Sequence, residues 1–240
     1  MLISEEFRFS IYFIRKGKIA YLKRRYSVRK MKSLRNIFLM FFLIVFFMGC
    51  SAMFVGSTND PHQKLTDAYG LLYNQNRPIP AEKLIQEAIE IFQKENDASG
   101  LAKGYATYGL FFNSPAVGHF SPYKTKGFLD KTVQYDQRYQ KALWYFDKAK
   151  EILKKEQDSE LNMSTLSMIL FYEAETYLNM YKTDSACKRY KKHIIKFKEY
   201  VSKYPDMKKF RNMSADSYEE YKIQMKYHMW RIGCENSDLP

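Results

Sequence analysis

The spacing of apolar residues restricts most of this chain to helical folds. Between residues 62 and 233, apolar side chains recur at three- and four-residue intervals, and the alternation that marks β-strands is scarce. The pattern predicts helices near 62–75, 80–95, 97–112, 134–156, 158–181, 184–204 and 214–233. We therefore expect an all-α chain.

Residues that favour helix ends stand at the expected boundaries. Pro80 suits the first turn of the second predicted helix, where its missing N–H would lack a partner in any case. Tyr204-Pro205 is a stop signal for the sixth helix. The candidate N-caps are Asn96 or Asp97 for the third helix, Asp158 or Ser159 for the fifth, Thr183 and Asp184 for the sixth, and Ser217 with Glu220 as a capping box for the last.

A second pattern, small-x3-large-x2-small, occurs three times within the predicted helices. Its members are Ala81, Ile85 and Ala88; Ala142, Phe146 and Ala149; and Ala186, Tyr190 and His193, the last in a degraded form. The pattern resembles the second helix of a tetratricopeptide repeat, and Tyr177, nine residues before Ala186, stands where that repeat places a tyrosine. The matched alanines lie 61 and 44 residues apart, against the usual 34.

This resemblance covers roughly residues 62–204 and implies an antiparallel helix-hairpin solenoid. About three degenerate repeats would stack, and the last predicted helix would cap the open end, because each repeat buries its apolar face only against a neighbour. An unrelated helical bundle is the alternative.

Residues 113–133 are expected to form a loop inserted into this helical domain. The segment contains two prolines, two glycines and the aromatic residues Phe120, Tyr123 and Phe128. Loops of this length are uncommon in compact domains and are often functional. Phe120 and Tyr123 are candidate partner-binding residues if they are exposed. Alternatively, they pin the loop onto the core.

The junction Phe47-Met48-Gly49-Cys50 follows a basic stretch that starts at Met31 and an apolar run of 12 residues, 37–48. Such a run is shorter than the roughly 20 residues that a transmembrane helix needs, and the order of segments is typical of a secretory signal peptide. The cysteine after the glycine resembles the lipobox of bacterial lipoproteins. This resemblance implies cleavage between Gly49 and Cys50 and lipidation of Cys50. An uncleaved signal anchor with an incidental cysteine is the alternative.

These features predict four segments: a basic leader at 1–30, a signal peptide at 31–49, a lipidated tether at 50–61 and the helical domain at 62–240. Met31 can open a signal of ordinary length, so we favour translation from Met31 over an unusually long leader. The formal charge of +13 is concentrated in residues 1–35, which carry a net +9. The rest of the chain carries only +4, so we expect no nucleic-acid partner.

Cys187 and Cys234 remain once Cys50 is assigned to the lipid anchor. An exported protein reaches an oxidising compartment where a disulfide persists. The sequence does not show whether the two Cα atoms come within bridging distance, and we favour two buried free thiols over the bridge.

Catalytic motifs for zinc proteases, dithiol redox proteins, serine hydrolases and phosphate-binding loops are absent from the sequence. The histidines His62, His119, His193 and His228 lack metal-ligand spacing. We therefore expect no enzyme activity, no metal and no cofactor. Lys188, Lys192 and Lys196 form a basic stripe that suits anionic headgroups or an acidic partner, or is simply a solvated face.

Together these features predict an envelope lipoprotein that is anchored by its lipid to the outer membrane and faces the periplasm. Its expected role is to hold an unidentified envelope protein, as a scaffold or assembly factor for an outer-membrane, pilus or secretion machinery. The alternative is a periplasmic enzyme or small-ligand-binding protein with a pocket under the loop 113–128.

Overall fold

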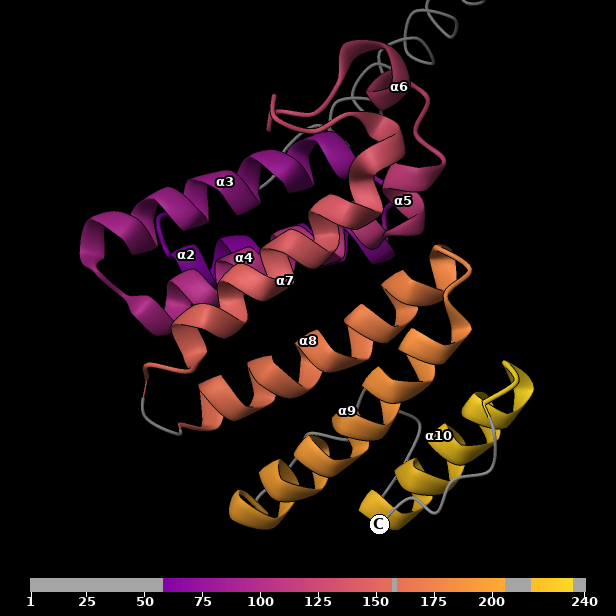
Figure 1. The fold of residues 1–240 in the computed structure, drawn as a ribbon. Coiled ribbons are helices and arrows are strands. Elements are labelled where there is room, and N and C mark those ends of the chain that lie inside the picture. The colour runs from indigo at the N-terminus through magenta and orange to yellow at the C-terminus, as the bar shows by residue number, and fades with distance from the viewer. Residues whose placement is uncertain (1–57, 157–158, 206–216, 235–240) are drawn as a thin grey trace, which may run out of the picture. The chain divides into compact units, whose positions relative to one another are not determined.

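The computed structural model describes residues 58–156, 159–205 and 217–234. These ranges contain helices and no β-strand (Figure 1), so the prediction of an all-α chain is confirmed for them. The helices are α2 (Pro61–Tyr73), α3 (Pro78–Glu95), α4 (Ala98–Asn113), α5 (Pro115–Gly118), α6 (Pro122–Lys126), the 3-10 turn η2 (Tyr135–Gln137), α7 (Arg138–Leu153), α8 (Glu160–Asn179), α9 (Thr183–Lys203) and α10 (Tyr218–Arg231).

Three of the predicted N-caps are formed by side chains that accept a backbone N–H. The Asp97 carboxylate accepts a hydrogen bond from the N–H of Gly100 at 2.8 Å, and the Ser159 hydroxyl accepts one from the N–H of Asn162 at 3.1 Å. The Ser217 hydroxyl accepts a hydrogen bond from the N–H of Glu220. The capping prediction for α9 is wrong, because Thr183 is already helical and Lys182 holds the N-cap position without a side-chain bond. α3 also starts earlier than predicted, since Pro78 rather than Pro80 occupies its first position.

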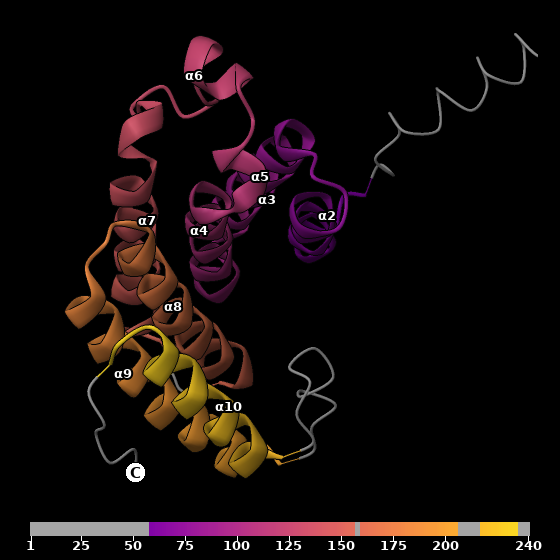
Figure 2. The same cartoon turned by 90° about the vertical axis from the view of Figure 1, so that its right-hand side faces the viewer.

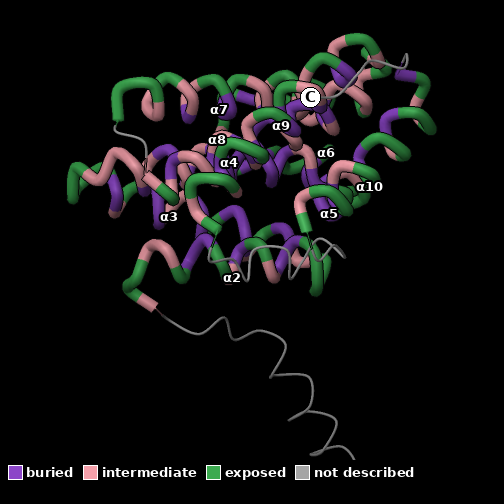
Figure 3. The backbone as a smooth tube through the Cα atoms, turned by 90° about the horizontal axis from the view of Figure 1, so that it is seen from below, coloured by how far each residue is buried: buried purple, intermediate pink, exposed green. Residues whose placement is uncertain are grey.

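The long helices pack in three sequential pairs. α3 folds back onto α2, α7 packs along α4, and α9 folds back onto α8 (Figure 1). α4 also contacts α3 and α8, and α7 contacts α8, so each pair is joined to the next. α10 packs chiefly on α9. Along the helices, buried and exposed segments alternate (Figure 3), as expected when one face of each helix packs.

The small-large-small pattern marks the packed face of the second helix in each pair. All nine of its residues are buried, on α3, α7 and α9. Phe146 of α7 packs so closely on α4 that a Cβ at Gly109 would lie 2.5 Å from its ring. A glycine at this position therefore permits the close approach of α4 and α7.

The predicted loop between α4 and α7 contains the short helices α5 and α6 and is fixed to the core by its own side chains. Tyr123 and Phe128 are buried, and their rings contact each other and Phe111 of α4. Phe120 is half-buried against Tyr123, with 5.3 Å between ring centroids. The hypothesis that Tyr123 is an exposed anchor is therefore wrong, because its ring fills core space.

The carboxylate of Glu82 holds the segment between α4 and α7 in place through hydrogen bonds. The side chain lies buried on α3, and its Oε1 accepts bonds from the Tyr108 hydroxyl at 3.0 Å and from the backbone N–H of Leu129 at 2.7 Å. Burial raises the pKa of Glu82, although these hydrogen bonds oppose the shift.

Candidate ligand groove between α2 and α10

A groove of about 750 Å³ is lined by side chains from α2, α4, α8, α9 and α10. In Figure 2, α4 and α8 lie between α2 on the right and α7 and α9 on the left. The lining residues are Tyr69, Lys103, Leu161, Ser164, Thr165, Ser167, Met168, Phe171, Tyr172, His193, Phe197, Tyr200, Tyr221, Gln224, Met225 and His228. α8 contributes more of them than any other helix, and none comes from the segment 113–128.

Tyrosines form the wall of the groove where α2 faces α8. The rings of Tyr69 and Tyr73 lie 4.5 Å apart on successive turns of α2 and are partly exposed. Tyr172 on α8 lies near both of them, and burial raises the pKa values of Tyr73 and Tyr172. The Tyr172 phenol therefore stays neutral and presents both an apolar ring and a hydrogen-bonding tip to a ligand.

Lys103 of α4 supplies a positive charge to the groove. Its side chain is half-buried, and burial lowers the pKa of the ammonium, while the charge of Asp60 partly opposes this effect. Within the described ranges, no carboxylate lies within 4 Å of its Nζ. An anionic group of a ligand would compensate this desolvated charge.

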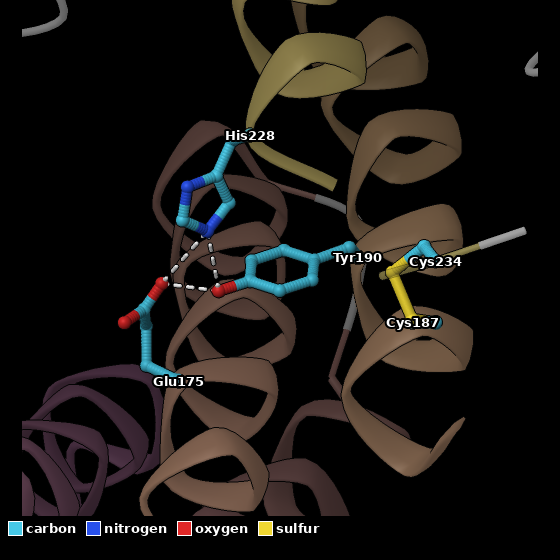
Figure 4. The surroundings of a disulfide bond; sticks show 5 residues. All are labelled: Glu175, Cys187, Tyr190, His228 and Cys234. Carbon is cyan, nitrogen blue, oxygen red and sulfur yellow. Dashed lines mark hydrogen bonds and ion pairs between the residues drawn. A yellow bond between two sulfur atoms is a disulfide. The ribbon is translucent and has the colours of Figure 1, made fainter. Parts of the chain in front are cut away.

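His228, which lines the groove, belongs to a hydrogen-bonded trio from three helices (Figure 4). The Tyr190 hydroxyl of α9 donates a hydrogen bond to the carboxylate of Glu175 of α8. His228 of α10 places Nε2 3.1 Å from the Tyr190 hydroxyl and 3.6 Å from Glu175 Oε1. Burial raises the pKa of Tyr190, so the phenol stays protonated and links the carboxylate to the imidazole.

His193 joins the same three helices deeper in the structure. Its Nδ1 lies 2.8 Å from the carbonyl oxygen of Ser167, and its Nε2 lies 2.6 Å from the Tyr221 hydroxyl. This geometry fits a neutral imidazole that donates from Nδ1 and accepts at Nε2. Burial lowers the pKa of His193 to about 4. With both nitrogens occupied, His193 holds α8, α9 and α10 together and is not available to a ligand.

The two cysteines of the helical unit are bonded to each other, contrary to the favoured prediction of free thiols. Cys187 of α9 and Cys234, just after α10, have Cα atoms 5.6 Å apart and form a disulfide (Figure 4). The reason is tertiary: α10 lies along α9 and brings residues that are 47 positions apart in sequence into contact. The bridge fixes the end of α10, and with it the His228 side of the groove.

The other predicted site residues lie elsewhere. Gly49 and Cys50 fall outside the described residues. Lys188 and Lys192 are exposed on α9, and Lys196 pairs with Glu199 at 2.5 Å; none of the three lines the groove. Within the described residues, no group of three His, Cys, Asp or Glu side chains could hold a metal ion.

The groove was not predicted from the sequence, although α8 carries a signal for it. Leu161, Thr165, Met168 and Tyr172 follow one another at four-, three- and four-residue spacing and line the groove together. These four residues form a second face of α8. Because the other face of the helix already packs on neighbouring helices, the second face indicates a binding surface.

Comparisons with known proteins found no family model, no curated protein and no solved structure that matches this chain. In the part of the chain that the structure describes, no helix has the length and apolar character needed to cross a bilayer.

Proposed function

We propose that the helical unit is a tetratricopeptide-like solenoid of three helix pairs, closed by α10, which holds a segment of a partner protein in the groove. The pairing of the helices supports this architecture, as does the buried small-large-small pattern on every second helix. The first helices of the second and third pairs add partial matches, Gly109 followed by Phe112 and Ala174 followed by Tyr177, to the glycine and tyrosine of the repeat. The interval of 61 residues is long because it includes the connection from Ser114 to Gln137.

The observation that carries the binding role is the composition of the groove. It is lined mainly by aromatic and methionine side chains, with the hydroxyls of Ser164 and Thr165 and one half-buried ammonium, that of Lys103. Extended inner surfaces of repeat arrays are binding surfaces. We infer that the ligand is a peptide segment that places an aspartate or glutamate side chain near Lys103, between apolar side chains.

Binding of short synthetic peptides to the full chain tests this role by fluorescence anisotropy. The peptides alternate aromatic residues with either aspartate or asparagine. Wild-type protein is expected to prefer the aspartate peptide, and Lys103→Met to lower its affinity about tenfold, because it removes the charge that faces the carboxylate. Lys188→Met is the matched control, since Lys188 is an exposed lysine outside the groove.

Two results would contradict the proposal. One is that neither peptide saturates binding. The other is that Lys103→Met and Lys188→Met change the affinity equally, because the charge would then act through the general field of the protein rather than in the groove.

We further propose that the chain is a lipoprotein anchored through Cys50 in the cell envelope, where it serves as a scaffold or assembly factor. The basic, apolar and small-residue segments that end at Cys50 support the anchor. The assignment to an outer-membrane, pilus or secretion machinery rests on analogy with other small lipoproteins.

The volume of the groove favours a second candidate function, the binding of a small molecule. At about 750 Å³, it lies within the range of small-molecule sites, roughly 300–1,000 Å³. Native mass spectrometry of the full chain purified from membranes discriminates the two candidates. An additional mass that remains under native conditions and is lost on unfolding would favour the small molecule over the peptide.

A further inference from the structure

The outer face of α10 carries an apolar stripe that nothing in the described structure covers. Ile223, Tyr227 and Trp230 are 65%, 60% and 63% exposed. They are spaced by four and three residues, so they share one face of the helix. Tyr221 and Met225 are buried on the opposite face. A terminal helix of a repeat array normally presents a polar outer face to solvent, and this one does not.

Opposite charges stand at the two ends of the same helix. Glu219 lies in the first turn and Arg231 at the last position of α10, and both are exposed. They are separated by about 18 Å along the axis, at 1.5 Å per residue. Within residues 217–234 and the other described ranges, neither side chain has an ion-pair partner within 4 Å. The face is therefore negative where the helix begins and positive where it ends, and the three apolar side chains lie between these ends, beside the exposed Lys226.

We propose that this face binds a second copy of the chain, with α10 packed antiparallel against α10 of that copy about a two-fold axis. An antiparallel arrangement brings Glu219 of each copy toward Arg231 of the second copy. It also stacks the apolar stripes on each other. A parallel arrangement would instead place like charges together at both ends. The face is thus complementary to itself, which is the requirement for a closed two-fold dimer.

The expected dimer is weak. Aromatic side chains bury roughly 150–250 Å² each, so three large side chains per copy give an interface below the standard size of about 1,600 Å². We expect a dissociation constant in the micromolar range. This inference does not depend on the groove, because none of the three stripe residues lines it.

Sedimentation equilibrium of the full chain in density-matched detergent micelles measures this association. Trp230→Glu is expected to raise the dissociation constant at least tenfold, because it replaces a large apolar side chain of the stripe with a charge. Tyr181→Glu is the matched control: Tyr181 is an aromatic residue that is 96% exposed at the turn between α8 and α9, and its replacement should leave the association unchanged.

Charge reversal tests the antiparallel geometry directly. Glu219→Arg alone or Arg231→Glu alone places like charges opposite each other and should weaken the dimer. The double variant Glu219→Arg/Arg231→Glu should restore it, since opposite charges face each other again. Circular dichroism of each variant checks that α10 remains helical.

Three outcomes would overturn the proposal. The wild type could remain monomeric at all concentrations up to about 0.5 mM, far above the micromolar constant expected for an interface of this size. The single and double charge variants could associate alike. Finally, a monomeric wild type could bind vesicles of equimolar phosphatidylglycerol and phosphatidylethanolamine, with Trp230→Glu abolishing that binding; the stripe would then be a membrane-binding face.

Discussion

His193 illustrates at the scale of one residue how burial selects a protonation state. Its two ring nitrogens contact the Ser167 carbonyl oxygen and the Tyr221 hydroxyl, and the side chain is almost completely buried. A proton on Nε2 would break the bond from Tyr221 and place a charge in the core. The neutral form is therefore the folded form.

We predict that the free energy of unfolding falls as the pH is lowered from 6.5 to 4. The folded-state pKa of His193 is about 4, against 6.5 in the unfolded chain, so only the unfolded state takes up the proton in this window. The stabilisation is complete above pH 6.5 and is lost by up to roughly 3 kcal/mol toward pH 4. Urea unfolding at a series of pH values measures this change.

The control for this prediction is His193→Gln, whose amide can still donate to Ser167 and accept from Tyr221 but does not titrate. Its stability should vary less with pH than that of the wild type. All other side chains are common to both proteins, so their contributions cancel in the difference. Equal pH dependence of the two proteins would exclude His193 as the source.

At the scale of elements, the contact between α4 and α7 depends on the absence of a side chain at Gly109. A methyl group there would overlap the ring of Phe146, which is itself completely buried. Gly70 on α2 is a matched helical glycine, since a Cβ at that position would meet nothing within 4 Å.

Gly109→Ala is therefore expected to destabilise the protein by about 1–3 kcal/mol, because the ring of Phe146 must move within a packed core. Gly70→Ala should be neutral or stabilising by up to about 1 kcal/mol, since alanine favours the helix. Chemical denaturation compares the two variants. Equal effects would show that helix propensity, rather than the packing of Phe146, determines the result.

The disulfide between Cys187 and Cys234 is the second feature at this scale that determines the stability of the fold. It closes a segment of 47 residues, and restricting the unfolded chain over that length stabilises the fold by about 4 kcal/mol in the chain-entropy description. We predict that a reductant lowers the melting temperature of the wild type and makes the chain near α10 sensitive to proteases.

Cys187→Ser/Cys234→Ser provides the control for the disulfide. The double variant should melt at a lower temperature than the oxidised wild type and should not respond to reductant. A wild type that melts identically with and without reductant would contradict the predicted role of the bridge.

At the scale of the whole molecule, the question is where the chain resides. If Cys50 is lipidated, the protein from a bacterial host should begin at Cys50, carry the mass of acyl chains and fractionate with membranes, whereas Cys50→Ala should show none of these properties. Intact-mass spectrometry and membrane fractionation measure both proteins. If both keep the residues before Cys50 and fractionate alike, the lipid anchor is excluded.

The candidate site was predictable only in part, because its residues are distant in sequence. Lys103 and His228 belong to helices whose own periodicity gives no sign that they share a groove. The burial of Tyr123 was not predictable from the local sequence either, because it depends on how the rings of Phe111 and Phe128 pack against its ring. The recurrence on α8 from Leu161 to Tyr172 was the one local signal.

The amino-acid sequence by itself determined the long helices and most of their boundaries, whereas the short helices α5 and α6 fall in the segment that was predicted to be a loop. The long helices depend on interactions within a few residues: apolar spacing of three and four, a side-chain cap at Asp97 or Ser159, and proline at a helix start. It also marked the packed face of α3, α7 and α9, because close packing requires small residues at fixed intervals.

Only the tertiary structure decided the bridge between Cys187 and Cys234, the burial of Tyr123, the groove and the exposed stripe on α10. Each of these depends on which helix lies beside which, and thus on contacts between residues many positions apart. A helical repeat pattern is compatible with several such arrangements, and the burial of side chains between neighbouring helices selects among them.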